Sequence, residues 1–292
     1  MFHGAITALV TPFLHDKFDE SAYAQIIKWQ IEQGIDGLVT CGTTGESPTL
    51  DHDLHNYVVE SCVKAAKGKV PVMAGAGSNC TKEAIRLCEH AKKVGADAVL
   101  IATPYYNKPN QEGIFQHFKA INDSVDIPIY IYNIPGRSVV DICDETIVRI
   151  ANLKNVVGLK DATGNLARVS TLRMHDLKDF IQLSGEDGTA VAFNSQGGEG
   201  VISVTSNVAP KAVALVQKYL KDGDYKNALE LHDKLMPLHV AMFCDASPAP
   251  AKYALSLLNK CTFDVRLPLV SLNPEKQKIV KDAMIRSGIL EK

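Results

Sequence analysis

The sequence predicts an α/β fold, a closed (β/α)8 TIM barrel with a C-terminal helical appendage. Short apolar runs rich in β-formers alternate eight times with segments of helical spacing, in units of roughly 25 residues. Such alternation indicates parallel strands joined by helical crossovers, and eight units favour a closed barrel over a doubly wound sheet. The 292 residues suffice for one barrel and an extension.

The eight expected strands and the helix that follows each are bounded by turn residues. The strands are Gly4–Thr11, Gly37–Thr40, Pro71–Gly75, Ala98–Ala102, Ile127–Tyr132, Val156–Lys160, Ile181–Ser184 and Val201–Val204. The helices are Ser21–Gln33, Asp51–Ala66, Thr81–Val94, Gln111–Ser124, Asp144–Leu153, Leu166–Met174, Thr189–Ser195 and Lys211–Leu220. We therefore expect residues 1–223 to form the barrel that carries the active site.

The pattern changes after Asp222, and residues 224–292 are expected to form a helical region. Helices are predicted over Tyr225–Phe243, Ala249–Leu258 and Pro274–Gly288, with no strand between them. Proline-containing segments separate these helices, because proline lacks the amide donor that would continue a helix. Their apolar faces need a partner, either the barrel or another subunit.

Composition excludes several classes of protein. The net charge is −2, and acidic and basic residues are mixed along the chain, which argues against nucleic-acid binding or a polybasic membrane patch. The seven cysteines are scattered without a CxxC spacing, so a disulfide framework or structural zinc site is not expected. No signal peptide or membrane-spanning run is visible, and a cytoplasmic location is expected.

Lys160 is the central candidate residue, because it ends a strand that reads as buried on both faces. A lysine there is costly to desolvate unless it is paired or functional, although a side chain that reaches solvent is the ordinary alternative. Catalytic groups of this fold lie at the carboxyl ends of the strands, which places Lys160 on the catalytic face. A lysine amine in a partly apolar pocket is more often neutral and can attack a carbonyl to form a Schiff base.

Other candidates follow neighbouring strands. Tyr132 ends the preceding strand and could shuttle protons, or it could be a half-buried barrel tyrosine. The Gly42–Gly45 turn could bind a small carboxylate through its amides and hydroxyls, or be an ordinary turn. Arg137 could clamp a second carboxylate, or be solvated. Together with Lys160 they indicate covalent carbonyl chemistry on small acids.

Other chemistries fit less well. The Gly75–Asn79 segment lacks the third glycine of a dinucleotide fingerprint, and no Walker loop is present. His52 and His55 stand three apart on a predicted helix, but no HExxH motif accompanies them. Solvated helix histidines are therefore favoured over metal ligands, and no metal site is predicted.

Six segments in order along the chain resemble the dihydrodipicolinate synthase family, within the superfamily of pyruvate-dependent class I aldolases and N-acetylneuraminate lyases. They are Gly4–Phe13 (GAITALVTPF), Gly42–Leu50 (GTTGESPTL), Thr103–Pro109 (TPYYNKP), Tyr132–Ser138 (YNIPGRS), Gly158–Gly164 (GLKDATG) and Gly198–Ser203 (GEGVIS). The Pro-Gly-Arg tripeptide that includes Arg137 separates this family from sialic-acid lyases and keto-deoxy-sugar aldolases, which usually lack the arginine.

The resemblance implies a lyase that condenses pyruvate with L-aspartate 4-semialdehyde, the first step of the diaminopimelate route to L-lysine. Lys160 would form the Schiff base with pyruvate, so no metal or organic cofactor is needed. The implied proton relay comprises Tyr132, Thr43 and Tyr106, the last reaching in from a neighbouring subunit. This makes a homo-oligomer part of the mechanism, typically a tetramer built from two dimers.

The resemblance also implies the substrate contacts and a regulatory site. Thr44 would hold the pyruvate carboxylate, Arg137 the carboxylate of the semialdehyde, and Gly185 and Ile202 would line the pocket with their backbone. L-Lysine would inhibit at micromolar to millimolar concentration by binding at the dimer interface. The matching positions are Ser47, His52, His55, Asn79, Glu83 and Tyr105.

Two positions depart from the family pattern. Cys41 replaces a usual aliphatic residue, and the Ser247–Pro250 segment (SPAP) replaces a usual Asn-Pro-Ile-Pro. Neither is expected to touch a chemical role. The alternatives to the synthase are a related pyruvate lyase or aldolase that acts on another aldehyde, and a non-enzymatic barrel.

Overall fold

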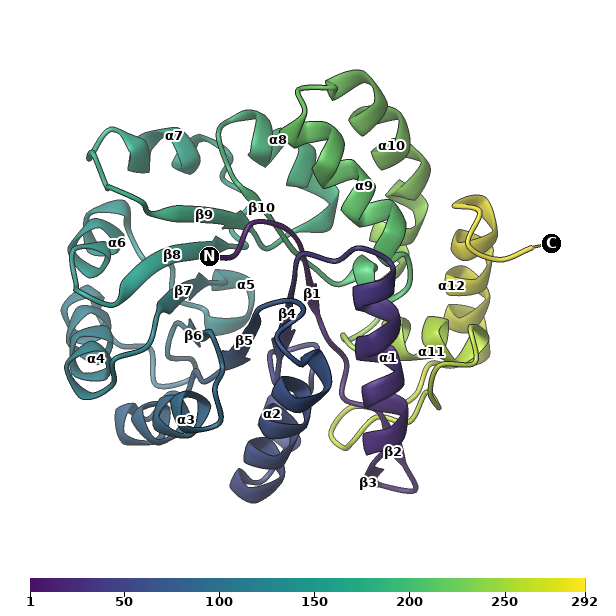
Figure 1. Ribbon diagram of the computed structural model, residues 1–292, viewed down its shortest axis with the longest axis horizontal. Helices are drawn as coiled ribbons and strands as arrows, with labels where there is room; N and C mark the ends of the chain where they lie inside the picture. Colours follow the sequence, from purple (N-terminus) through teal and green to yellow (C-terminus); the bar gives the residue numbers. More distant parts are fainter. Residues whose placement is uncertain (292) are drawn as a thin grey trace.

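The computed structural model describes residues 1–291 and confirms the predicted barrel. Eight parallel strands close in the order β1-β10-β9-β8-β7-β6-β5-β4, and Figure 1 looks into the ring that they form. Their bounds are Gly4–Ala8 (β1), Gly37–Thr40 (β4), Val72–Gly75 (β5), Ala98–Ala102 (β6), Ile129–Asn133 (β7), Val156–Asp161 (β8), Ile181–Ser184 (β9) and Gly200–Ser203 (β10). All eight strands were predicted, with end points that differ by a few residues.

The predicted helices surround this ring. They are α1 (Glu20–Glu32), α2 (His52–Ala66), α3 (Thr81–Lys93), α4 (Gln111–Ser124), α6 (Asp144–Ala151), α7 (Ala167–Arg173), α8 (Ala190–Ser195) and α9 (Pro210–Lys221). Short helical turns that were not predicted follow several strands, namely η1 (Ser47–Thr49), α5 (Pro135–Ser138), η2 (Asp187–Thr189) and η3 (Thr205–Asn207). These turns shape the loops at the carboxyl ends of the strands, where the candidate residues lie.

A small antiparallel hairpin precedes α1 and was not predicted. It pairs β2 (Phe13–Leu14) with β3 (Lys17–Phe18) through His15 and Asp16, whose φ angles are 50° and 62°. Both turn residues therefore lie in the left-handed region that a two-residue type I′ hairpin requires. The sequence signal for such turns is Asn-Gly or Asp-Gly, which is absent here.

Two apolar cores hold the fold together. The larger core lies between the barrel and its helices and contains Ile26, Phe118 and Leu159 among many buried residues. The smaller core fills the barrel interior and includes Phe2 and Tyr130, whose rings pack edge to face with centroids 5.7 Å apart. The interior is therefore a packed core with its amino-terminal end closed, and the reactive space is confined to the opposite end.

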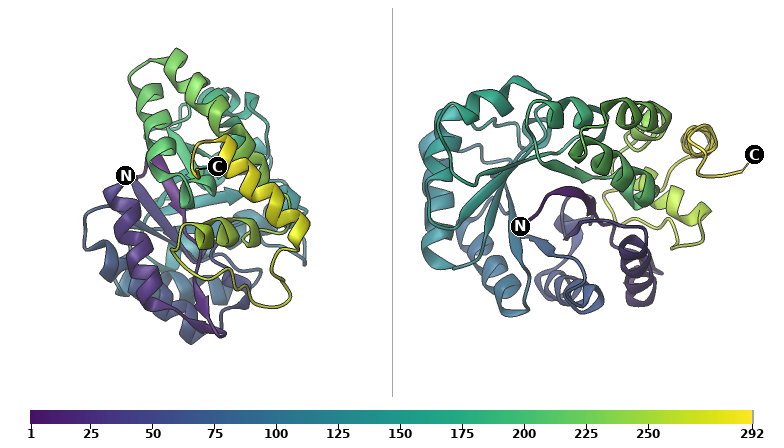
Figure 2. Two further views of the ribbon diagram at one scale, coloured as in Figure 1. Left: turned by 90° about the vertical axis from the view of Figure 1, so that its right-hand side faces the viewer. Right: turned by 45° about the horizontal axis from the view of Figure 1, so that its top comes forward.

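The C-terminal region is helical, as predicted, and packs against the barrel. It contains α10 (Tyr225–Ala241), α11 (Ala249–Leu257) and α12 (Pro274–Arg286). Helix α10 packs on α9 and α12, and both Figures 1 and 2 place these helices beside the barrel. Buried residues of α10, α11 and α12 belong to the larger core, in which α10 packs on α9 of the barrel and α12 packs on α10 and α11.

Candidate active site

A cavity of about 350 Å³ opens at the carboxyl ends of the strands and gathers most of the residues predicted to be catalytic or substrate-binding. Six residues predicted to be catalytic or substrate-binding line it: Thr43, Thr44, Tyr132, Arg137, Lys160 and Gly185. They come from the ends of β4, β7, β8 and β9 and from the loops just beyond. The parallel barrel brings them together because its strands all end at the same face.

Lys160 projects from β8 into this cavity. Its side chain is 7% exposed, and its Nζ lies 4.1 Å from the centroid of the Tyr132 ring. Burial lowers the pKa of Lys160 to about 8, although the carboxylates of Asp187 and Glu186 oppose this shift. The positive charge of Arg137 lowers the same pKa further. A neutral amine, the form that attacks a carbonyl, is therefore accessible near neutral pH.

Tyr132 is the neighbour of Lys160 in the paired register of β7 and β8. Residues that are paired across parallel strands face the same side of the sheet, so both side chains point into the barrel. Burial raises the pKa of Tyr132 to about 12, opposed by the charge of Arg137 and by the hydroxyl of Thr43. The phenol keeps its proton at neutral pH and can pass it on and regain it.

Gly185 follows β9 and leaves room for the lysine. A Cβ at this position would lie 2.8 Å from the Cβ of Ala162 and 3.1 Å from the Cε of Lys160. Its amide donates a hydrogen bond of 2.6 Å to the carbonyl of Asp161. Any larger residue would therefore push against the Lys160 side chain.

The Gly-Thr-Thr-Gly turn after β4 forms one wall of the cavity. Its amides at Gly45 and Glu46 bond to carbonyls within the turn, at 3.0 and 3.1 Å. The hydroxyl of Thr11 anchors the turn by donating a 2.7 Å hydrogen bond to the carbonyl of Gly45. Thr44 is 5% exposed and lines the cavity, in a position suited to hold a small carboxylate.

Glu46 ties this turn to the C-terminal region. Its carboxylate pairs with the ammonium of Lys252 from α11, and both side chains are fully buried. The Lys252 Nζ also lies 4.2 Å from the centroid of the Phe13 ring and donates a 2.7 Å hydrogen bond to the carbonyl of Asp264. The wall of the cavity therefore depends on a residue more than two hundred positions away.

Arg137 lies at the rim of the cavity, on the short helix α5 that begins with Pro135. Proline at the first helical position sets the backbone for this turn. The guanidinium is solvent-exposed and close enough to Tyr132 and Lys160 to affect the pKa of each. A planar fork at the mouth of the cavity suits the carboxylate of an incoming substrate.

Two of the residues predicted to be catalytic or substrate-binding do not line this cavity. Tyr106 is 89% exposed and has a φ of 69°, so its ring extends into solvent from the loop after β6. Ile202 lies on β10 with 1% exposure, and its side chain belongs to the inner barrel core.

The residues predicted to bind an inhibitor cluster beside the cavity wall. His52 Nε2 lies 3.1 Å from a Glu83 carboxylate oxygen. Burial and, to a smaller extent, the negative charge of Glu83 raise the pKa of Tyr105. Asn79 interacts with the Tyr105 hydroxyl through its backbone. Ser47 begins η1, just before helix α2, which carries both histidines.

The expectation of solvated helix histidines is wrong for His55. This residue is 6% exposed, and its Nε2 lies 3.0 Å from the carbonyl of Gly75. Burial lowers the pKa of His55 to about 4, so the ring is neutral near pH 7. His55 lies on the buried face of α2. The spacing between the two histidines did not indicate which of them would be buried.

The lining residues that were not predicted as site residues include Glu186, Phe243 and Ser247. Glu186 directly follows Gly185. Its position just beyond the end of β9 was the sequence signal that could have identified it as a cavity residue. Phe243 and Ser247 come from the segment between α10 and α11, for which the sequence carries no signal. The Ser247–Pro250 segment, for which no chemical role was expected, therefore reaches the cavity through Ser247.

A larger hollow, of about 670 Å³, lies at the opposite end of the barrel. Its lining includes Gly4, Asp36 and Glu199, which stand at the amino-terminal starts of strands. We assign the chemistry to the smaller cavity, because it contains the lysine of lowered pKa and the side chains around it.

Two features are absent from residues 1–291. Within that range, no group of three or more His, Cys, Asp or Glu side chains is placed to hold a metal ion. Also within it, no helix is long and apolar enough to cross a membrane.

Comparison with known proteins places the chain among well-described relatives. Residues 1–286 match the Dihydrodipicolinate synthetase family. The chain is 60% identical to the 4-hydroxy-tetrahydrodipicolinate synthase of Parvibaculum lavamentivorans over 290 residues, which cover 99% of this chain and 100% of that protein.

Two crystal structures share the fold closely. One is a chloride-inhibited dihydrodipicolinate synthase from Acinetobacter baumannii complexed with pyruvate, with a TM-score of 0.97 and 40% identity over 99% of this chain and 100% of that one. The other is DHDPS from Cyanidioschyzon merolae with lysine bound, with a TM-score of 0.96 and 38% identity over 99% of each chain. By sequence and by structure, this chain belongs to the dihydrodipicolinate synthetase family.

Proposed function

We propose that this chain is a 4-hydroxy-tetrahydrodipicolinate synthase that condenses pyruvate with L-aspartate 4-semialdehyde. The observation that carries the proposal is a buried Lys160 of lowered pKa beside Tyr132, with Arg137 at the mouth of the same cavity. The full-length relative at 60% identity bears the name of this activity. Arg137 favours this aldehyde over those of related lyases, because it offers a fork to the semialdehyde carboxylate.

The first half of the reaction joins pyruvate to the enzyme. The neutral Lys160 amine attacks the ketone carbon of pyruvate while Thr44 and its turn hold the carboxylate. The carbinolamine then loses water to give an iminium, and the Tyr132 hydroxyl, with Thr43 next to it, relays the protons. The iminium withdraws electrons from the adjacent methyl carbon, which loses a proton to form the enamine.

The second half uses the semialdehyde. Arg137 binds its carboxylate, and the enamine carbon attacks its aldehyde carbon to form the new carbon–carbon bond. The aldehyde C=O π bond opens, its oxygen takes a proton from the relay, and the iminium with Lys160 is restored. The amine of the bound substrate then displaces the Lys160 amine at the iminium carbon, which closes the ring and releases the enzyme. Gly185 and Ile202 would contribute their backbone to the pocket.

Tyr106 is proposed to complete the proton relay of a second subunit. Its ring is exposed on a loop and does not reach the cavity of its own chain, which is the placement expected of a donated residue. A homo-oligomer then becomes a requirement of catalysis. A tetramer of two dimers is the proposed assembly.

L-Lysine is proposed to inhibit at the cluster around Glu83. The glutamate would hold an ammonium group, and Tyr105 is adjacent in sequence to the shuttling Tyr106. Residues Ser47, His52, His55 and Asn79 would complete the site. Binding there would move the loop that carries both tyrosines, and turnover indifferent to saturating lysine would contradict this regulatory role.

We also propose a division into a barrel of residues 1–223 and a helical region of residues 224–292. The second region supports the site as well as the fold, since Phe243 and Ser247 line the cavity.

Borohydride trapping in the presence of pyruvate, followed by peptide mapping, tests the function. The expected result is an adduct on Lys160 and consumption of aspartate semialdehyde by the untrapped enzyme. The Arg137→Ala variant should still trap pyruvate but lose most of its turnover of the semialdehyde, with a residual rate that can be measured. The matched control is Arg149→Ala, since Arg149 pairs with Glu112 on the outer surface. Absence of an adduct on Lys160 refutes every Schiff-base function, whereas trapping without semialdehyde turnover indicates another aldehyde.

A further inference from the structure

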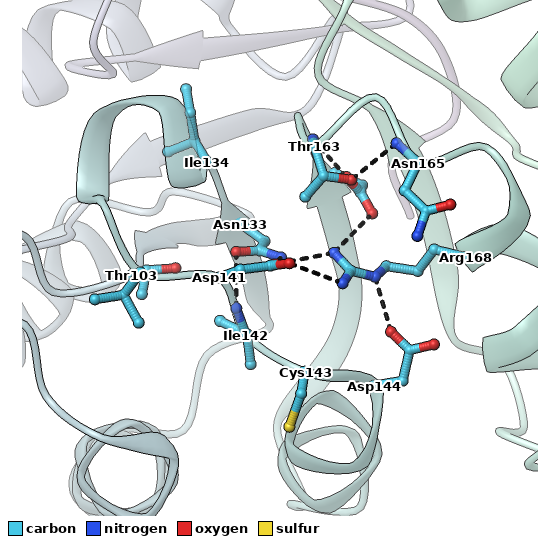
Figure 3. Close-up of polar contacts among 12 residues, drawn as sticks. Thr103, Asn133, Ile134, Asp141, Ile142, Cys143, Asp144, Thr163, Asn165 and Arg168 are labelled. Atoms are coloured by element: carbon cyan, nitrogen blue, oxygen red, sulfur yellow. Dashed lines mark hydrogen bonds and ion pairs between the residues drawn. The ribbon is translucent and has the colours of Figure 1, made fainter.

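A polar network of buried and half-buried side chains lies at the carboxyl ends of β7 and β8, and Figure 3 shows its contacts. Its centre is Arg168 of α7, whose side chain is only 6% exposed. Three carboxylates surround the guanidinium: Asp141, Asp144 and Asp161. None of these four residues was predicted as part of the site, and the proposed reaction gives them no chemical role.

The first connection of the network is to the strand of Lys160. Asp161 directly follows Lys160 on β8, so its side chain points to the opposite face of the sheet. One carboxylate oxygen of Asp161 accepts hydrogen bonds from the amide and hydroxyl of Thr163, at 2.7 and 2.6 Å. The other oxygen is buried without a hydrogen bond and lies 3.7 Å from Arg168 Nη1. The guanidinium is therefore the charge that compensates this carboxylate.

The second connection is to the strand of Tyr132. Asn133 follows Tyr132 on β7, is fully buried and pairs in register with Asp161. Its amide nitrogen donates a 2.6 Å hydrogen bond to an Asp141 oxygen, and its carbonyl oxygen accepts a 3.2 Å bond from the amide of Ile142. Figure 3 shows Asn133 and Arg168 meeting at the Asp141 carboxylate.

The third connection is to the loop of Arg137. This loop leaves β7 at Asn133 and returns at Asp141, so the bonds between Asn133 and Asp141 close its base. Arg168 holds Asp141 in a two-pronged contact, with Nη1 and Nη2 donating to its two oxygens at 3.1 and 3.2 Å. Its Nε donates a 2.8 Å bond to Asp144, the first residue of α6. Such a fork fixes direction as well as distance.

We propose that Arg168 is a positioning residue of the condensation, which holds the strand ends of Lys160 and Tyr132 and the loop of Arg137 in one arrangement. This inference rests on the proposed function. Without the guanidinium, three carboxylates would stand together without their shared cation, and the base of the Arg137 loop would lose its support. Arg168 does not line the cavity. It acts only through the three carboxylates that it contacts.

Steady-state kinetics of Arg168→Gln test the proposal. We expect kcat/KM for aspartate semialdehyde to fall by about tenfold to a hundredfold, the size of effect that a displacement of about 1 Å produces. Borohydride trapping of pyruvate on Lys160 should also slow. Arg149→Gln, which removes another arginine–carboxylate pair on the surface, is the matched control and should keep wild-type kinetics.

The conservative variant separates the two tasks of the guanidinium. Arg168→Lys keeps a cation near Asp161 but cannot bind both oxygens of Asp141. It should therefore restore pyruvate trapping while the KM for aspartate semialdehyde stays raised. A variant that merely weakens the fold would not divide the two half-reactions in this way.

A double-mutant cycle with Arg137→Ala supplies the decisive comparison. If Arg168 acts through Arg137, Arg168→Gln lowers kcat/KM by a smaller factor in the Arg137→Ala background than in the wild type. Equal factors in both backgrounds, or wild-type kinetics for Arg168→Gln, would overturn the proposal. If Arg168→Gln does not fold, Asp141→Asn is the variant to test, and it should raise the KM for the semialdehyde. An unchanged KM for Asp141→Asn would also overturn the proposal. A wild-type protein that traps no pyruvate would refute the proposed function itself.

Discussion

Replacing Glu186 with glutamine should make the reactive amine more available at neutral pH. Glu186 lines the cavity, and its carboxylate raises the pKa of Lys160, as does the stronger effect of Asp187. Glutamine has the same shape without the charge. The Lys160 cation then loses one stabilising partner, so its pKa should fall below about 8.

The size of the effect follows from the two protonation states. With a pKa of about 8, roughly one Lys160 amine in eleven is neutral at pH 7, whereas the ordinary value of 10.5 would leave roughly one in three thousand. Loss of an opposite charge shifts a pKa by about one to three, and a half-buried partner belongs at the lower end. A fall of about one brings the neutral fraction to roughly one half, which predicts adduct formation about fivefold faster at pH 7.

The assay is the second-order rate constant for pyruvate adduct formation, measured by borohydride quenching between pH 6 and pH 10. The wild-type rate should rise with pH through about 8, and the Glu186→Gln curve should rise earlier and meet it at high pH. Glu275→Gln, at an exposed position of α12, serves as the control. The reasoning would be refuted if the inflection of the Glu186→Gln curve stayed at the wild-type pH or moved to a higher pH. It would also be refuted if Glu186→Gln remained faster than the wild type at pH 10.

Three further predictions concern stability and assembly. Lys252→Met should lower the free energy of unfolding by about 3–5 kcal/mol in urea titrations because Glu46 becomes a buried unpaired charge, and adding Glu46→Gln should recover part of this loss. Phe118→Ala should cost about 3–5 kcal/mol in the same titration, since the ring is fully buried in the core, and a loss below about 1 kcal/mol would contradict the packing. Mixed oligomers of Tyr106→Phe and Lys160→Ala chains should regain activity if Tyr106 serves a neighbouring subunit, whereas mixtures that stay inactive after exchange would argue against a shared site.

Local pattern was enough to predict the barrel, because each strand and helix carries its own periodicity. A run such as Ala98–Ala102 is apolar throughout and is bounded by polar residues, which suits a strand covered on both faces. The hairpin at Phe13–Phe18 escaped prediction because two residues per strand are too few to establish a period.

Position along the chain predicted the candidate site best where a polar residue lies at, or just beyond, the carboxyl end of a strand. Lys160, Tyr132 and Thr44 satisfy that condition, and the barrel topology then brings them together. Glu186 satisfies it as well, but nothing local distinguishes it from a solvated carboxylate. Its effect on Lys160 depends on the folded distance between two strands.

The sequence by itself was enough to predict the architecture, and also the gathering of Lys160 and its polar neighbours at one face, since both depend on order along the chain and on rules that hold for every parallel barrel. Only the tertiary structure decided what packs behind them. Phe243 and Ser247 reach the cavity from beyond the barrel, and Arg168 gathers three carboxylates from separate segments. Such contacts join residues that are far apart in sequence, so the hydrophobic periodicity of a single segment does not predict them. A buried charge is stabilised by the partner that the fold places beside it, and that partner can come from any segment.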